Sequence, residues 1–223
     1  MDLHLFSDAD LRDDILTACR PYLESRQDAV LAYLPAGTFN PSWREETIQA
    51  FQNLAQVKTL DPEMMTLPEM EAVLRDAALL YIPDGNTFLL NHRVHLSRIM
   101  EPLRRKVGAG LPVVAFSAGT VLCGPNILTS NDLNLIPTTY FTGLSASRFN
   151  FNVHYPEDPA GCAERDEWLN DYHIFHDNAV LLLSDGACLR IKGKKTSLVR
   201  GEAWVLRKGR EKQPLDLGQS IME

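Results

Sequence analysis

Residues 112–122 read Pro-Val-Val-Ala-Phe-Ser-Ala-Gly-Thr-Val-Leu, an apolar run that leads directly into Ser117, Ala118 and Gly119. The run predicts a buried strand over 113–116, and the residues that follow predict a helix. A serine at a tight strand-to-helix turn is typical of a nucleophile elbow, which lifts the hydroxyl above the sheet. The other interpretation is that Ser117 only caps the helix, a role that serine fills well. This stretch alone leaves both interpretations open.

Outward from this stretch, short apolar runs alternate with longer amphipathic segments. Strands are expected at residues 3–6, 29–34, 57–60, 78–82 and 113–116. Helices are expected at residues 8–23, 42–55, 68–75 and 87–107. This alternation is typical of a parallel sheet with helices on both of its faces. We therefore predict an α/β fold with a mostly parallel sheet.

The last third of the chain has a different pattern. Short strands separated by turns that contain glycine are expected at residues 179–183, 188–192, 196–199 and 203–206. Closely spaced strands of this kind indicate antiparallel hairpins. The chain has no internal repeat and no linker long enough to separate two units, so residues 1–223 are predicted to form a single domain.

The composition argues against two classes of function. The 223 residues contain 22 Lys and Arg against 29 Asp and Glu, a net charge of -7, whereas nucleic-acid binding needs clustered cations. No apolar run approaches the ~18–20 residues that span a bilayer, so no membrane association is expected. The N-terminus lacks the basic start of a secretory signal, and the four cysteines show no metal-type spacing. We therefore expect reduced thiols and a cytoplasmic location.

A serine nucleophile needs a general base, which is most often histidine. His154 lies in an alternating run, residues 149–155, that delivers it to the end of a strand just before Pro156. Because functional side chains gather at such ends, His154 is the favoured base, although a satisfied, partly buried histidine would show the same pattern. No HExxH motif or third ligand accompanies the other histidine pairs, so no metal is expected. These pairs are His92 with His95 and His173 with His176, and the two histidines of each pair are three positions apart.

Four separated blocks of sequence then form one pattern. They are Asp84-Gly85-Asn86-Thr87-Phe88-Leu89, Phe116-Ser117-Ala118-Gly119 with Pro125 to Asp132 downstream, Phe151-Asn152-Val153-His154-Tyr155, and Ser184-Asp185-Gly186. In order and spacing they resemble the peptidase E family of alpha-aspartyl dipeptidases. Members of that family are serine peptidases with a fold similar to that of class I glutamine amidotransferases, which implies an amidotransferase- or flavodoxin-like sheet here. The resemblance runs from Leu3 nearly to the end of the chain.

The resemblance implies a catalytic triad. Ser117 would be the nucleophile, His154 the general base, and Asp185 the acid that orients the imidazole, at a position where the family more usually has Glu. The order of these residues differs from that in α/β-hydrolases, whose acid precedes the histidine. The other interpretation of Asp185 is an Asp-Gly turn between two strands.

By the same resemblance, the backbone N–H groups of Gly85 and Ala118 would form the oxyanion hole. Asp84 departs from the glycine that the family carries there. Asn86 would contribute to substrate binding, and its alternative is a turn residue that tolerates left-handed φ values.

The resemblance further implies an activity and its requirements. Ser117 would attack the carbonyl of a substrate's N-terminal residue, and an acyl-enzyme would form and be hydrolysed by water. The expected substrate is a dipeptide or very short peptide, no cofactor is needed, and a homodimer is left open.

Specificity depends on the segment Gly161 to Trp168. Family members that take N-terminal Asp are expected to bind its carboxylate there with basic residues, which suit a carboxylate. When aligned on Gly161, this chain has acids at those positions, and Arg165 lies one residue away. We assign Arg165 to substrate binding and expect strict specificity for Asp-X dipeptides to fail. The alternative for this segment is a surface helix whose charges face solvent.

Three rival functions remain. The first is a catalytically weak or inactive homologue that binds a small peptide or amino acid, which the Asp84 and Asp185 departures would favour. The second is a cysteine enzyme of the amidotransferase-like fold that uses Cys123, although this residue lies beyond the elbow and suits a small core position. The third is a nucleotide-binding module, which ranks last because no GxGxxG motif follows the first strand.

Overall fold

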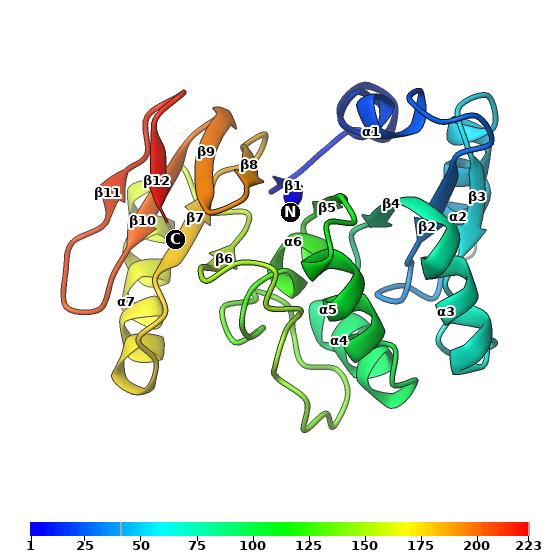
Figure 1. Ribbon diagram of the computed structural model, residues 1–223. Coiled ribbons are helices and arrows are strands. Elements are labelled where there is room, and N and C mark those ends of the chain that lie inside the picture. The colour runs from blue at the N-terminus through cyan, green and yellow to red at the C-terminus, as the bar shows by residue number, and fades with distance from the viewer. Residues whose placement is uncertain (41, 223) are drawn as a thin grey trace.

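Parallel strands form the centre of the fold in the computed structural model, which describes residues 1–40 and 42–222 (Figure 1). They are β1 (Asp2–Phe6), β2 (Val30–Tyr33), β3 (Gln56–Thr59), β4 (Ala77–Ile82) and β5 (Val113–Phe116). Their spatial order is β1-β5-β4-β2-β3, and each neighbouring pair is parallel. The predicted mostly parallel sheet is therefore confirmed.

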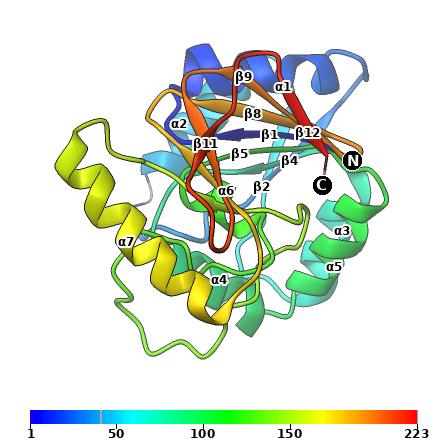
Figure 2. The ribbon, with the colours of Figure 1, turned by 90° about the vertical axis from the view of Figure 1, so that its left-hand side faces the viewer.

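Helices cover both faces of this sheet, as predicted (Figures 1 and 2). One face carries α1 (Leu16–Leu23), preceded by a π-helical segment (Leu11–Ile15), and α2 (Ser42–Phe51). The other face carries α3 (Leu67–Asp76), α4 (Thr87–Leu96), α5 (Met100–Gly108) and α6 (Ala118–Leu122). The strands β2 and β4 between them are buried at every position, whereas the edge strand β3 is not. This burial explains why the sequence of β4 reads as a continuous apolar run rather than an alternating one.

The C-terminal third adds antiparallel strands in two places. The main sheet continues beyond β1 through β8 (Cys188–Lys192), β9 (Lys195–Arg200) and β12 (Ser220–Met222), all with antiparallel pairing. A second sheet has the order β11-β10-β7-β6 and consists of β6 (Asn150–Asn152), β7 (Val180–Leu183), β10 (Ala203–Leu206) and β11 (Gln213–Pro214). Helix α7 (Pro159–Phe175) packs beside this second sheet through Leu169 and Tyr172 (Figure 2).

The pairing of these strands is more complex than a series of hairpins. Strands β8 and β9 form the predicted hairpin, but β10 pairs with β7 instead of β9. From β7 onward the chain changes sheets three times: at the turn before β8, at Gly201, whose φ is +75°, and between β11 and β12. A side chain at Gly201 would lie 2.6 Å from the Ala187 Cα, so the second crossing passes tightly over the first.

The predicted helix over residues 87–107 is wrong in one respect, because it is two helices. Helix α4 ends at Leu96 and α5 begins at Met100. Between them Arg98 has a φ of +63°, in the left-handed region that ends helices. The turn brings Ile99 and Met100 into the core, where they are 0% and 3% exposed. Burial of these side chains therefore decided the break, and arginine gave no local signal for it.

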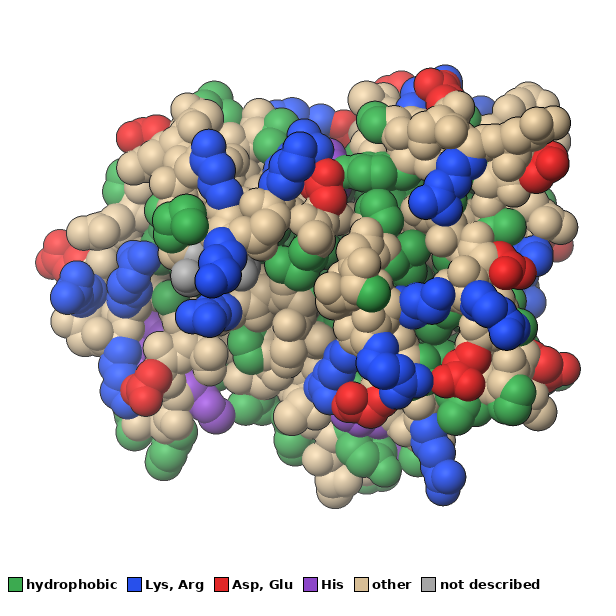
Figure 3. Space-filling view, in the orientation of Figure 1, with side chains coloured by type: hydrophobic (Ala, Val, Ile, Leu, Met, Phe, Trp, Pro, Cys, Tyr) green, Lys and Arg blue, Asp and Glu red, His purple; other side chains and the backbone are tan. Residues whose placement is uncertain are grey.

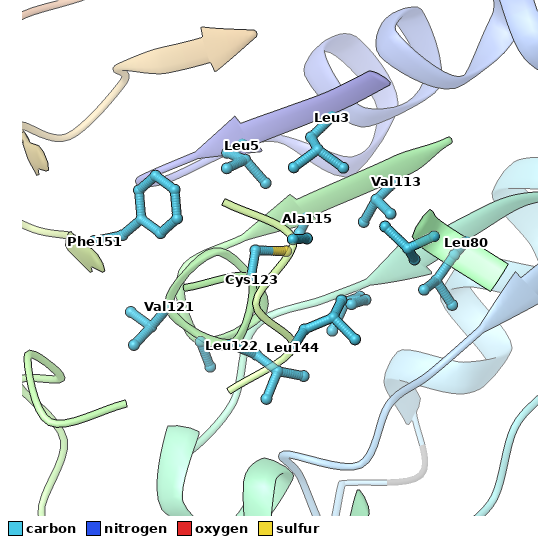
Figure 4. Packing of buried hydrophobic residues seen from close by; sticks show 14 of the residues in the cluster. Leu3, Leu5, Leu80, Val113, Ala115, Val121, Leu122, Cys123, Leu144 and Phe151 are labelled. Atoms are coloured by element: carbon cyan, nitrogen blue, oxygen red, sulfur yellow. The ribbon is translucent and has the colours of Figure 1, made fainter. Parts of the chain in front are cut away.

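The large core cluster joins the sheet to the second sheet across α6. Figure 4 shows Leu5, Ala115, Cys123 and Phe151 pointing toward one another from β1, β5, the end of α6 and β6. All four cysteines of the chain are free. Within the described ranges, no helix combines the length and apolar character needed to cross a bilayer. On the face shown in Figure 3, Lys and Arg side chains are interspersed with Asp and Glu.

The break at Arg98 generates a prediction about stability. Replacement Arg98→Gly should raise the free energy of unfolding by about 1 kcal/mol, because glycine adopts the left-handed region without a Cβ clash. The control Arg105→Gly removes an exposed arginine from within α5 and should lower it by about 1 kcal/mol. Urea denaturation measures both. A loss of stability in Arg98→Gly would contradict the assignment of the helix boundary.

Candidate active site

Ser117 occupies a strained turn between β5 and α6. Its φ of +49° and ψ of -116° lie outside the regions that serine normally adopts. The Ser117 backbone N–H donates to the Phe6 carbonyl over 3.0 Å, which ties the turn to the end of β1. Although Ser117 stands at the N-cap position, its side chain makes no capping hydrogen bond. The interpretation of Ser117 as only a helix cap is therefore wrong for its side chain.

Close packing explains why small residues follow the serine. Gly119 lies against the end of β4, and a Cβ there would be 2.3 Å from the Ile82 carbonyl oxygen. Thr120 is fully buried, and its hydroxyl donates to the Phe6 carbonyl over 2.8 Å. The first turn of α6 is thus held against β1 on one side and β4 on the other, which leaves the Ser117 hydroxyl directed at a different partner.

That partner is His154. The Ser117 hydroxyl oxygen lies 3.0 Å from His154 Nε2. His154 follows β6 with a φ of +52°, and its Nδ1 lies 2.6 Å from Asp185 Oδ1. An Nδ1–H that donates to the carboxylate leaves the Nε2 lone pair to accept from the serine hydroxyl, which is the tautomer that a general base requires. The three residues predicted as a triad are therefore brought together in hydrogen-bonding sequence.

Asp185 sits in a turn between β7 and β8. The Ala187 N–H donates to the Ser184 carbonyl over 3.1 Å, and Gly186 has a φ of +76°, as a tight turn requires. Asp185 is thus a turn residue, as one interpretation expected, and its carboxylate also reaches the histidine. Its role as the acid of a triad stays a prediction. The turn is braced by Arg200, whose Nε donates to the Gly186 carbonyl over 2.8 Å.

The brace on this turn depends on an ion pair. The Arg200 guanidinium bonds both carboxylate oxygens of Asp14, which precedes α1. The hydrogen bond from Arg200 lowers the pKa of Asp14 below its ordinary 3.8, and Asp14 in turn raises the pKa of Arg200. The Asp14 side chain is 18% exposed and that of Arg200 is 48% exposed, so the pair lies at the surface, where an ion pair contributes modestly to stability.

Gly85 and Ala118 belong to two segments, the loop after β4 and the start of α6. Ala118 is the first residue of α6, where backbone N–H groups point away from the helix. Gly85 has a φ of +148°, and a Cβ there would lie 2.5 Å from the Gly37 carbonyl carbon, so only glycine fits. The loop after β4 is held by the Asn86 N–H, which donates to the Gly37 carbonyl over 2.8 Å. The oxyanion role of the two N–H groups stays a prediction.

Asn86 caps helix α4, a local structural role close to that of the turn residue considered as its alternative. Its Oδ1 accepts from the Leu89 N–H over 3.0 Å and caps α4. Its Nδ2 donates to the Leu133 carbonyl over 2.9 Å, so both ends of the amide are engaged. Asp132 adds a second cap, accepting from the Thr87 N–H over 2.7 Å. Asp132 had no assigned role in the sequence, and its signal was its place in a block of the family pattern. Substrate contact by Asn86 stays a prediction.

Arg165 projects from α7 into a pocket of about 360 Å³. Its guanidinium bonds the Oδ1 atoms of Asn131 and Asn152, and Trp168 lies 5.7 Å from it. Desolvation lowers the pKa of Arg165. The pocket is lined by Ser130, Asn131, Asp132, Pro156, Gly161, Glu164, Arg165 and Trp168. Because Asn131 Nδ2 also donates to the Val153 carbonyl, the pocket adjoins the segment that carries His154.

Sequence reasoning missed two groups that support the site. Ser7, directly after β1, accepts a hydrogen bond from the His154 N–H over 2.8 Å. The Tyr155 hydroxyl donates to Asp166 on α7 over 2.6 Å, and Lys212 binds Asp166 over the same distance. The only sequence signal for Ser7 was its position at the end of a strand. Asp166 lies in the segment where the family resemblance implies basic residues, and no sequence pattern indicated that Tyr155 and Lys212 are its partners.

Other candidates of the sequence analysis lie elsewhere. Cys123 is fully buried at the end of α6 (Figure 4), and burial raises the pKa of its thiol to about 12. A thiol held protonated in the core is no nucleophile, so the cysteine-enzyme interpretation is wrong. His92 and His95 contact the long loop that follows α6, bonding Thr138 and the Thr142 carbonyl.

Comparisons with known proteins place the chain among peptidases. A family model described as Peptidase family S51 matches residues 5–199. The "Probable alpha-aspartyl dipeptidase" of Drosophila melanogaster is 34% identical over 139 residues, which are 60% of this chain and 58% of that protein. The Peptidase E of Streptomyces coelicolor is 28% identical over 92% of this chain and 89% of its own length.

A solved structure shows the same fold. The peptidase from an acI-B1 actinobacterium superposes with a TM-score of 0.74 at 17% sequence identity, covering 100% of this chain and 96% of its own.

The contact between Gly85 and Gly37 generates a prediction. Replacement Gly85→Ala should lower the free energy of unfolding by about 2 kcal/mol or more, because the new methyl meets backbone atoms and φ is unfavourable for alanine. The matched control is Gly108→Ala in α5, where no atom lies within 4 Å of the added carbon. It should gain about 0.5–1 kcal/mol. Equal stability of the two variants in urea denaturation would refute the close approach of the two loops.

The ion pair of Asp14 predicts a pH dependence. Its folded-state pKa is lowered, so its contribution to stability is complete above 3.8 and is lost as the pH falls through the folded value. At pH 6, Asp14→Asn should therefore lower the thermal midpoint by about 2–4 °C. The difference from wild type should vanish as the pH falls below the folded-state pKa of Asp14. The exposed Asp13 offers the control Asp13→Asn, which should leave the midpoint unchanged. A difference that persists in acid would refute the argument.

Proposed function

The chain belongs to peptidase family S51, and from this premise we propose that it is a serine peptidase that removes the N-terminal residue from dipeptides or very short peptides. The observation that carries the proposal is the continuous hydrogen-bond chain of the site. Ser117 Oγ lies 3.0 Å from His154 Nε2, and His154 Nδ1 lies 2.6 Å from Asp185 Oδ1. If Ser117 were only a helix cap and Asp185 only a turn residue, neither would need to form a hydrogen bond with His154.

The mechanism follows from which atom holds each proton. His154 Nε2 takes the hydroxyl proton as Ser117 Oγ attacks the carbonyl carbon of the substrate's first residue. The imidazolium that forms is stabilised by Asp185 and then gives its proton to the leaving amine. Water next attacks the acyl-enzyme, again with His154 as the base, and the ester bond to Ser117 breaks. The reaction consumes one water and returns every group to its starting state.

The developing oxyanion needs donors that are already in place. We assign this task to the N–H groups of Ala118, at the start of α6, and Gly85, in the loop after β4. Both lie at the carboxyl edge of the parallel sheet, where the ends of β4 and β5 are adjacent. Contact of Gly119 with the Ile82 carbonyl fixes the distance between these two segments. Donors held in this way stabilise charge without having to reorganise during the reaction.

The shorter carboxylate supports activity rather than its loss. Asp185 reaches His154 at a normal hydrogen-bond distance, so the replacement of Glu by Asp is accommodated by the turn between β7 and β8. The rival function, an inactive homologue that only binds a small peptide, would not need this contact. It remains the alternative against which activity is tested.

For specificity we propose a preference other than a strict one for N-terminal Asp. The pocket beside the His154 segment contains Arg165, but Asp132 and Glu164 line it as well. The Arg165 guanidinium is already bound by two asparagine side chains. A pocket with one engaged cation and two carboxylates is a poor site for the carboxylate of a substrate.

We further propose a cytoplasmic location, because the four cysteines of the chain are free.

The test is amine release from a panel of X-Leu dipeptides and X-p-nitroanilides. Ser117→Ala and Asp185→Ala should each lower kcat by about 10³–10⁶-fold, because the triad acts as a unit. The control Asp177→Ala removes an exposed carboxylate paired with Lys208 and should leave kcat unchanged.

Each outcome has a definite meaning. Activity that survives Asp185→Ala would remove Asp185 from the triad while leaving the serine in place. An inert wild type that gains thermal stability with a peptide would support the binding homologue. A strong preference for Asp-X substrates would refute the specificity proposal alone.

A further inference from the structure

We propose that Ser7 is a positioning residue that fixes His154 and the turn of Asp185 relative to each other. The proposal rests on the proposed function, because it concerns the same site. Ser7 follows β1 directly and is 0% exposed. Its backbone N–H, its hydroxyl hydrogen and its hydroxyl oxygen each make a separate hydrogen bond.

The first connection holds the histidine. The His154 N–H donates to the Ser7 hydroxyl oxygen over 2.8 Å. With a φ of +52°, His154 is in the left-handed region, which a side chain larger than glycine occupies only when its surroundings hold it there. The conformation turns the imidazole away from the direction of β6 and toward Ser117. Loss of the acceptor would remove a restraint on this backbone conformation of His154.

The second connection holds the acid. The Ser7 hydroxyl donates to the Leu183 carbonyl over 3.1 Å, and the Ser7 N–H donates to the Ala187 carbonyl over 3.0 Å. Leu183 and Ala187 flank the turn that carries Asp185. The Tyr155 N–H also donates to the Leu183 carbonyl, over 2.9 Å. Ser7 therefore lies where the segments of the base and the acid meet.

Ser117, the third member of the proposed triad, is bound by Phe6, the residue before Ser7. Ser117 donates its N–H to the Phe6 carbonyl, so two consecutive residues at the end of β1 contact all three triad segments. A hydroxyl is required at position 7 because one buried atom must accept from one partner and donate to another. Alanine would take away the acceptor of the His154 N–H, which bonds to the fully buried Ser7 side chain, and a donor that loses its partner in such a place is unfavourable. The imidazole would then lose its alignment with Ser117 and Asp185.

The experiment measures the reactivity of Ser117 with a fluorophosphonate, together with hydrolysis of the best substrate of the panel. In the labelling reaction the serine oxygen bonds to phosphorus, fluoride leaves and His154 takes the hydroxyl proton, so the rate reports the alignment of base and nucleophile. Ser7→Ala should lower the labelling rate and kcat by about 10- to 100-fold with little change in KM. Ser7→Thr keeps the hydroxyl and should recover most of the rate.

Two controls separate positioning from loss of structure. Thr47→Val removes another buried hydroxyl, one that bonds the Trp43 carbonyl within α2, and should leave the labelling rate unchanged. In a His154→Ala background, Ser7→Ala should cause no further loss, because the group that Ser7 positions is gone. If Ser7→Ala does not fold, Ser7→Cys takes its place, since it keeps the size of serine with a weaker hydrogen-bonding group.

The outcomes distinguish this inference from the function on which it rests. An unlabelled Ser117 in the wild type would overturn both. A labelled wild type with an unchanged Ser7→Ala variant would overturn the role of Ser7 alone. A further loss in the His154→Ala background would also overturn it, because Ser7 would then act on the site by another route.

Discussion

The carbonyl oxygen of Phe6 accepts hydrogen bonds from the Ser117 N–H and the Thr120 hydroxyl, and the rest of the site depends on this contact. It joins the end of β1 to the strained turn after β5. The contact exists because the two strands are parallel neighbours with Phe6 opposite Phe116, so both end at the same level. A turn with a φ of +49° at serine persists only when such contacts hold it. The reactive geometry is therefore a consequence of strand register.

The central position of β1 extends this constraint to the other two members of the site. β1 pairs with β5 on one side and with the antiparallel β8 on the other. The turn of Asp185 leads into β8, and His154 follows β6 in the second sheet, whose neighbour β7 leads into the same turn. Residues from three parts of the chain thus meet at the ends of rigid strands, and a site built in this way needs no large rearrangement to form.

Two acidic residues of α7 have different surroundings. Asp166 faces Tyr155 and Lys212 and anchors the segment after His154, whereas Glu164 lines the pocket of Arg165. The positions at which the family pattern would place cations are in part used to hold the helix against the second sheet. The same helix therefore carries both a structural anchor, Asp166, and residues of the Arg165 pocket.

The sequence by itself determined the alternation of strands and helices and the strand-to-helix turn at Ser117, because these depend on local periodicity. The grouping of Ser117, His154 and Asp185 followed from the resemblance to the peptidase E family. The sequence also indicated Asp185 without deciding between a turn and an acid, since an Asp-Gly pair fits both. Only the tertiary structure decided the break at Arg98, the exchange of β10 to the second sheet and the part of Ser7. These depend on burial and on hydrogen bonds between residues far apart in the chain. Ser7 and His154 are separated by 147 positions, and no local pattern contains the information that brings them together.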